Sequence, residues 1–246
     1  NSQINITSPN EQTIPTLTYG NLDILGGNRI FSPTGTIKIC SAFTVNPALY
    51  SYTVTGSTVE YISTDTGWNM TPFTYNNLIF SGSGTFNLGN TSGNIVNVLG
   101  NYSQSAGTVY IANAGRSATI NIDGNMTVSG GTLNVKTANG TGTGTVNLKG
   151  NLDVEGTVTA VTSGTKNFNF TGTTQTINYA GATKPAYISF NVKGGSTVQL
   201  INQDLALDTN SIFTVESGGT LDFGFDGNTA LNIVRRFTAP SSYASG

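Results

Sequence analysis

The side chains best suited to ligand recognition are four aromatic residues gathered in one stretch of the chain. Residues 47–73 contain Tyr50, Tyr52, Tyr61 and Trp68, the only tryptophan among the 246 residues. Exposed aromatic rings stack on sugar rings and anchor protein interfaces, because they offer a large apolar area with a polar tip. We predict a binding surface at these four residues. The alternative is that some of the rings cap an apolar interior.

Acid and base chemistry has few residues to draw on. The chain has no histidine, which removes His-based catalysis and His-ligated metals. Two carboxylates roughly 5 to 9.5 Å apart would still suffice for glycoside hydrolysis. The 12 acidic residues are scattered, however: Asp123 and Asp153 hold different repeat positions, and Asp204 and Asp208 are the closest pair on an expected strand. We therefore predict no catalytic residues and no enzymatic activity, with a carbohydrate-active protein as the alternative.

The densest acidic spot lies at residues 222–228, where Asp222 and Asp226 alternate with glycines and phenylalanines. Calcium prefers oxygen clusters, but this stretch lacks the bidentate glutamate of a helix-loop-helix site and the glycine-rich nonapeptide of calcium-binding β-rolls. Asp-Gly and Gly-Asn are ordinary turn sequences, so a turn is expected here. The single cysteine, Cys40, excludes an intramolecular disulfide and is expected to be a small, partly buried side chain. We predict neither a metal nor a cofactor.

The composition favours packed β structure. The chain has 31 glycines and 9% charged residues, against about a quarter in ordinary soluble domains. Hydrophobic residues alternate with polar ones in stretches such as 145–148 and 157–159, which places one row of side chains on each face of a strand. A net charge of −2 disfavours nucleic-acid binding, and no apolar run approaches the ~18 residues of a membrane span. An all-β protein with almost no helix, no nucleic-acid partner and no membrane insertion is predicted.

A short repeat supplies the expected strands. Each copy reads apolar-Asn-apolar-x-Gly-Asn-apolar and continues into a Gly-Thr-apolar strand, so one repeat holds about three short strands. Three short strands cannot bury their own face, so the copies must stack into a solenoid with coils roughly 4.8 Å apart. The glycine before each asparagine is expected to adopt a positive φ at a corner. The three clearest copies occupy residues 96–102, 120–126 and 146–152.

The polar residues of this repeat suggest ladders along the solenoid. Either the asparagines inside the strands or those of the Gly-Asn pairs are predicted to stack into hydrogen-bonded rows, with turn formation as the favoured alternative for the Gly-Asn set. Thr-x-Thr patterns also suggest the hypothesis of an ice-binding surface. Their spacing along the chain is irregular, however, and threonine is a good strand former. The two asparagine sets are Asn97, Asn121 and Asn147, and Asn101, Asn125 and Asn151.

A second, longer pattern reads Tyr-x-x-apolar-x-apolar-x-Gly followed by a strand. Its two best copies begin at Tyr75 and Tyr187, and a weaker copy begins at Tyr19. No change of composition marks a linker between these copies. We therefore expect a single solenoid array over residues 1–246, in which residues 47–73 form an irregular, aromatic-rich insertion.

In residues 75–88 and 168–200, and in the strand-Gly-Asn-strand units between 96 and 160, the sequence resembles repeat-rich surface proteins of Bacteroidota-type bacteria. These are large β-helical adhesins and related proteins, often exported by the type IX secretion pathway. The resemblance covers most of the chain. It implies a right-handed parallel β-helix at the cell surface or outside the cell, acting as a stalk or adhesin segment, with surface glycans or other cell-surface proteins as partners. No terminal sorting domain is visible, which favours a fragment of a longer surface protein.

Overall fold

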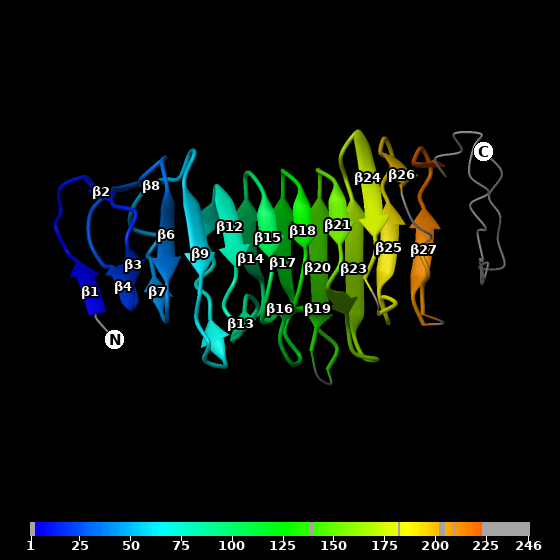
Figure 1. The fold of residues 1–246 in the computed structure, drawn as a ribbon, viewed down its shortest axis with the longest axis horizontal. Coiled ribbons are helices and arrows are strands. Elements are labelled where there is room, and N and C mark those ends of the chain that lie inside the picture. Colours follow the sequence, from blue (N-terminus) through cyan, green and yellow to red (C-terminus); the bar gives the residue numbers. More distant parts are fainter. Residues whose placement is uncertain (1–2, 138–139, 182, 202–204, 209, 223–246) are drawn as a thin grey trace.

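The computed structural model describes residues 3–137, 140–181, 183–201, 205–208 and 210–222. Over these residues the chain forms strands and turns and no helix. The strands pair in parallel with their counterparts in the preceding and following coils. Figure 1 shows the coils side by side along one long axis. The predicted all-β solenoid with about three strands per coil is confirmed.

One sheet runs along the whole described solenoid and takes one strand from each coil. This ten-stranded sheet, sheet C, is continuous because each strand pairs in register with the strands of the neighbouring coils. Its strands are β3 (Thr18–Tyr19), β6 (Thr36–Ile39), β9 (Thr58–Tyr61), β12 (Asn77–Phe80), β15 (Tyr102–Gln104), β18 (Met126–Val128), β21 (Leu152–Val154), β24 (Thr174–Tyr179), β26 (Thr197–Leu200) and β28 (Thr220–Asp222).

A second face precedes sheet C within each coil. It is built from the three-stranded sheet B and, further along, the seven-stranded sheet E. Sheet B contains β2 (Gln12–Ile14), β5 (Arg29–Phe31) and β8 (Tyr52–Thr53). Sheet E contains β11 (Thr74–Tyr75), β14 (Asn94–Val98), β17 (Ala118–Ile122), β20 (Thr143–Leu148), β23 (Thr165–Phe170), β25 (Ser189–Val192) and β27 (Ile212–Val215).

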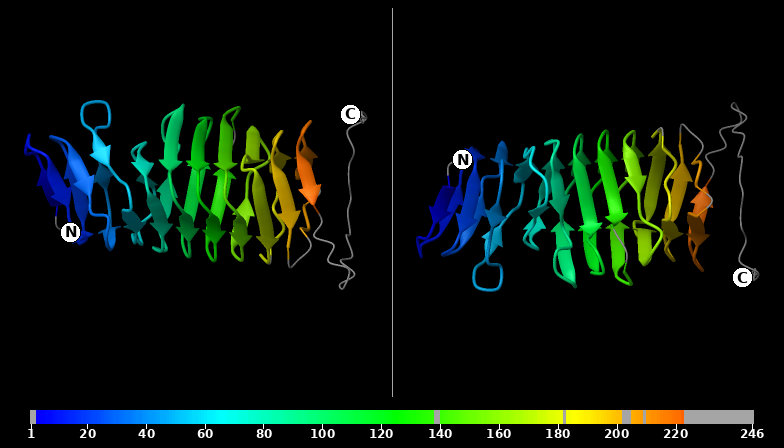
Figure 2. Two further views of the ribbon diagram at one scale, coloured as in Figure 1. Left: turned by 90° about the horizontal axis from the view of Figure 1, so that it is seen from above. Right: turned by 90° about the horizontal axis from the view of Figure 1, so that it is seen from below.

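The third face follows sheet C within each coil, and Figure 2 shows the stacked strands from two further sides. It consists of the three-stranded sheet A and the five-stranded sheet D. Sheet A contains β1 (Gln3–Ile6), β4 (Asn21–Ile24) and β7 (Phe43–Thr44). Sheet D contains β10 (Trp68–Asn69), β13 (Thr85–Asn87), β16 (Thr108–Ala112), β19 (Thr132–Lys136) and β22 (Thr157–Thr159).

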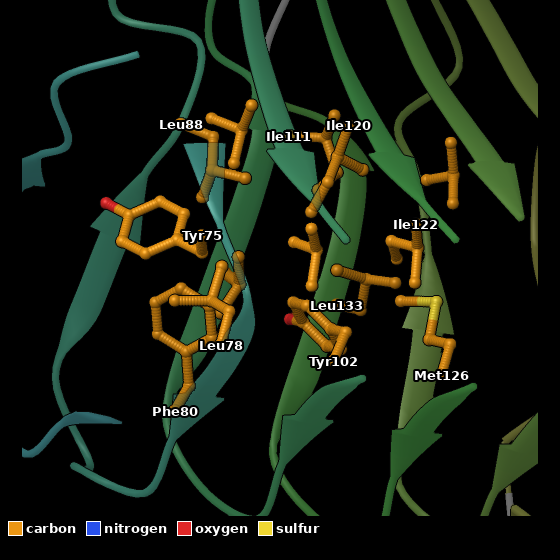
Figure 3. Close-up of a cluster of buried hydrophobic side chains, with 14 of the residues drawn as sticks. Tyr75, Leu78, Phe80, Leu88, Tyr102, Ile111, Ile120, Ile122, Met126 and Leu133 are labelled. Atoms are coloured by element: carbon orange, nitrogen blue, oxygen red, sulfur yellow. The ribbon is translucent and has the colours of Figure 1, made fainter. Parts of the chain in front are cut away.

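The short repeat corresponds to one circuit of the coil. Its apolar-Asn-apolar part forms a strand of sheet E, the Gly-Asn pair turns the corner into sheet C, and the Gly-Thr pair begins a strand of sheet D. Alternate side chains of each strand face inward, as the burial of β17 and β20 shows. The inward rows of the three faces meet in one apolar core, part of which appears in Figure 3 with Leu78, Tyr102 and Met126.

The glycines of the Gly-Asn pairs do not have the positive φ that was expected. Positive φ occurs instead at Gly107 and Gly131 of the Gly-Thr pairs, with values of 66° and 69°. At Gly150 the requirement is steric, because a Cβ atom there would lie 2.1 Å from the carbonyl oxygen of Gly124 in the preceding coil. The corner is a place of close backbone approach between coils, which only glycine permits.

The longer tyrosine pattern does not mark equivalent positions of the coil. The strands that follow Tyr19, Tyr75 and Tyr187 are β4, β12 and β25, which lie in sheets A, C and E. A strand, a glycine turn and another strand occur at more than one corner of a three-sided coil. The pattern therefore predicts strands correctly and carries no information on which face they occupy.

Residues 47–73, predicted as an irregular insertion, contain regular strands of the solenoid as well as irregular stretches. The segment contains β8, β9 and β10, and β9 pairs in register with β6 and β12 on either side. Val54, Val59 and Phe73 of the segment are buried in the core. The segment still departs from the array: residues 47–49 form an exposed turn, sheets A and B end at β7 and β8, and sheets D and E begin at β10 and β11. Only sheet C continues through it.

Candidate functional site

The four predicted aromatic residues do not form a common exposed surface. Tyr61 is only 2% exposed, and its hydroxyl lies 2.9 Å from the hydroxyl of Tyr75 in the core. Tyr52 is half-buried, and its hydroxyl accepts a hydrogen bond from the backbone N–H of Asn46 at 3.0 Å. Trp68 is partly buried against the core, and its indole N–H donates to Ser63 Oγ at 2.7 Å. Tyr50 is also partly exposed.

Two of these rings, Tyr52 and Tyr61, belong to an interior aromatic cluster. The ring of Tyr52 lies 5.2 Å from that of Phe73 in an edge-to-face arrangement, and the ring of Tyr61 stacks on Phe80 at 5.4 Å. Such pairs add about 0.5–1.5 kcal/mol to the area that they bury. The cluster stabilises the coils near β8 to β12. Because β9 pairs with coils on both sides, these rings lie inside the core and do not cap its end.

Several acidic side chains of the described residues bind cations and amides. Asp123 pairs with Lys149 at 2.7 Å, and Asp153 accepts a hydrogen bond from Asn178 Nδ2 at 2.9 Å. Within the described part of the chain, no group of three or more potential metal ligands occurs. Asp204 and Asp226 lie outside the described residues. Cys40, just after β6, is partly buried and carries a free thiol, as expected.

The asparagines inside the strands form a hydrogen-bonded ladder on the outside of sheet E. Nδ2 of Asn121, Asn147 and Asn169 each donates at 2.8 Å to Oδ1 of the asparagine one coil earlier. Asn191 extends the ladder by donating to Asn169 Oδ1 at 2.9 Å. The predicted ladder through Asn97, Asn121 and Asn147 is confirmed, and it is longer than predicted. Asn169 and Asn191 also lie between two apolar residues, outside the three clearest copies of the short repeat, so the apolar-Asn-apolar pattern identifies the added ladder residues.

The Gly-Asn asparagines form a second ladder of a different kind at the corner between sheets E and C. The backbone N–H of Asn125 donates to Oδ1 of Asn101, and that of Asn151 donates to Oδ1 of Asn125, both at 2.9 Å. The same contact joins Thr176 N–H to Asn151 Oδ1 at 2.9 Å. These side chains therefore both form the turn at the corner and link neighbouring coils. Ladder formation and turn formation, the two predicted alternatives, both apply to them.

The outer face of sheet E carries a second polar row beside the asparagine ladder. In-register pairing places Thr119, Thr145, Asn167 and Ser189 one above another, two positions before the ladder residues of the same strands. All four side chains are partly exposed. We call these two rows, from β17 to β25, the amide-hydroxyl face. Its eight members are Thr119, Asn121, Thr145, Asn147, Asn167, Asn169, Ser189 and Asn191, and none of them is charged.

A pair of lysines lies on the inner side of the connection between sheets D and E. Lys136 is fully buried and donates through Nζ to the carbonyl oxygen of Ala114. Lys166 is 9% exposed and donates to the carbonyl oxygen of Thr162 at 3.2 Å. Burial lowers the pKa of both amines, and the charge of Lys136 lowers that of Lys166 further. The inward placement of Lys136 directly after the buried Val135 breaks the alternation of β19 and could not be predicted. Lys166 lies two positions before Phe168 on β23, where alternation places both side chains on the inward face.

No protein-family model, no curated protein and no solved structure matches this chain. Over the part of the chain that the structure describes, no helix is long and apolar enough to cross a membrane.

Proposed function

We propose that this chain is a structural segment of a secreted or cell-surface protein, acting as a stalk or adhesin segment. The observation that supports this function most directly is the unbroken sheet C, whose ten strands follow one another without a gap. At about 4.8 Å per coil, the ten strands span roughly 43 Å. A stalk needs such a rod, because it holds whatever it carries at a fixed distance from its attachment point.

Rigidity along the rod comes from bonds that repeat between coils. Besides the backbone ladders, the asparagine ladder and the Gly-Asn ladder each join neighbouring coils through side chains. In a solenoid each coil contacts only its neighbours, so interfaces between coils decide the stability of the whole rod. A chain that carries load along its axis would benefit from every added link between coils.

A coil deletion tests this proposal. Removing residues 97–146 joins Val96 to Asn147. Val96 occupies the same place in sheet E as Val146 two coils later, so the register is kept. The deleted chain should remain a solenoid and be shorter by roughly 10 Å. With the chain placed between a bead and a fluorescent reporter, the height of the reporter above the bead should fall by this amount.

The same protein distinguishes the alternative function. Incubation with a panel of polysaccharides should release no reducing ends and no unsaturated products. Release of such products would support the carbohydrate-active alternative, and a reporter height that does not change with the number of coils would rule out a spacer.

A further inference from the structure

We infer that the amide-hydroxyl face of sheet E is an ice-binding surface. This inference goes beyond the proposed function, because a stalk needs no ligand. It rests on the residual hydrogen-bonding capacity, the periodicity and the chemical uniformity of this face.

Asn121 and Asn147 in the middle of the ladder each keep half of their hydrogen-bonding capacity for an outside partner. A side-chain amide has two N–H donors and an oxygen with two lone pairs. Asn121 and Asn147 each use one donor toward the preceding coil and one lone pair toward the following coil. One donor and one acceptor therefore remain at each of these two partly exposed residues, whereas Asn169 is only 8% exposed and Asn191 also donates to the carbonyl oxygen of Ser189. The hydroxyls of Thr119 and Thr145 in the neighbouring row can likewise donate and accept.

These groups form a two-dimensional array with fixed repeats. Consecutive coils place equivalent side chains about 4.8 Å apart, and the two rows are separated by two residues along each strand, roughly 6.7 Å. Both rows are in register between coils. One row contains Thr119, Thr145 and Asn167, and the other contains Asn121, Asn147 and Asn169. Because the backbone and ladder bonds already hold the array, little conformational entropy is lost when many of its groups engage a partner together.

The chemistry of the face favours frozen water over other partners. An ice surface is uncharged, periodic in two dimensions, and made of molecules that both donate and accept hydrogen bonds. The outward-facing residues of β17, β20, β23 and β25 contain no charged and no aromatic side chain. Sugars in protein sites commonly stack on aromatic rings, and this face offers none.

The size of the face also disfavours a protein partner. Its two rows cover on the order of 19 by 10 Å, which is well below the roughly 800 Å² per partner of a standard protein interface. The face of sheet D is a poorer array, although its Thr85, Thr108 and Thr132 are aligned. Its second row includes Tyr110, which interrupts the small polar side chains.

Slow freezing of a dilute solution of the 246-residue chain tests the inference. The fraction of protein taken into the growing ice is compared with the fraction left in the liquid, for the wild type and two matched variants. Thr145→Lys places a charge in the middle of the amide-hydroxyl face. Thr132→Lys makes the same change at an outward-facing threonine of sheet D, between Thr108 and Thr157. Circular dichroism melting of all three proteins confirms that they are folded, and Thr119→Lys replaces Thr145→Lys if the latter does not fold.

The wild type and Thr132→Lys should be enriched in the ice, and Thr145→Lys should be excluded from it. Exclusion of the wild type would overturn the inference, as would enrichment that survives in Thr145→Lys or is lost in Thr132→Lys. Parallel pull-downs on cellulose and chitin test the alternative that the face binds a polysaccharide. Adsorption to these solids that depends on Thr145, without adsorption to ice, would assign the face to a polysaccharide. The rod length and its dependence on coil number are measured separately, so failure here leaves the proposed stalk intact.

Discussion

The hydroxyl groups of Tyr61 and Tyr75 lie 2.9 Å apart inside the solenoid, where both side chains are buried. Burial, together with the neighbouring Tyr75, raises the pKa of Tyr61 well above its ordinary value of 10.0. Burial also raises the pKa of Tyr75 and Tyr102. The phenolate forms of these residues are incompatible with the folded interior.

Alkaline pH should therefore unfold the protein. Because the folded-state pKa values are raised, the contribution of these tyrosines to stability is complete below pH 10 and is lost as the pH rises above it. Circular dichroism at increasing pH should show loss of β structure together with the rise of phenolate absorbance. The double variant Tyr61→Phe and Tyr75→Phe should shift the transition to higher pH. Ionisation of Tyr61 and Tyr75 without unfolding would contradict the prediction.

Replacement of Asn147 by alanine should break the asparagine ladder at its centre. Asn147 donates to Asn121 and accepts from Asn169, and each hydrogen bond contributes about 0.5–1.5 kcal/mol. The free energy of unfolding should fall by about 1–3 kcal/mol, measured by urea denaturation. Thr119→Ala is the matched control, because Thr119 is an outward residue of the adjacent strand β17 without a ladder bond, and it should change stability much less.

The ladder illustrates how far the sequence could predict this structure. Repetition revealed the coil, because Asn97, Asn121 and Asn147 return at intervals that match one circuit of three strands. Repetition could not reveal which face a strand joins, since the pattern around Tyr75 and Tyr187 recurs in sheets C and E. That choice depends on the length of each connection and on packing between coils, neither of which leaves a local signature.

The predicted exposure of Tyr61 is wrong for a different reason. Tyr61 follows Val59 by two positions, so strand alternation places both side chains on the same, inward face. Their surroundings lacked the Gly-Asn signature, and the segment was therefore predicted to be an insertion instead of a coil. Composition alone cannot separate an exposed aromatic platform from an aromatic core, because both use the same residues.

Alanine at Gly150 should be strongly destabilising although the residue lies in a turn. A Cβ atom there would meet the carbonyl oxygen of Gly124 at 2.1 Å, and backbone cannot move aside without disturbing the neighbouring coil. We expect a loss of about 3 kcal/mol or more, at the upper end of overpacking effects. Gly115→Ala is the control, because its nearest neighbour would lie 4.0 Å away and its φ is not positive. In thermal denaturation, the melting temperature of Gly150→Ala should be far below those of the wild type and the control. Equal melting temperatures would refute the steric argument.

Arg29 should hold the first coils of the solenoid together. Its side chain is 1% exposed, and its guanidinium donates to the carbonyl oxygens of Ser8, Asn10 and Asn28 at 2.7–2.9 Å. Methionine at this position fills a similar volume but leaves those carbonyls without their charged donor, at a cost of about 1–3 kcal/mol for each buried group left unpaired. Because coils of a solenoid contact only their neighbours, the damage should stay local.

Hydrogen exchange measured by mass spectrometry provides the test. In Arg29→Met, amides of β1, β2 and β4 should exchange faster, while those of β17 to β21 keep the wild-type rate. Arg116→Met serves as the control, since Arg116 is exposed and donates to Asn90 Oδ1 at the surface, and its exchange should match the wild type throughout. Uniformly faster exchange along the whole chain in Arg29→Met would show instead that the solenoid unfolds as one cooperative unit.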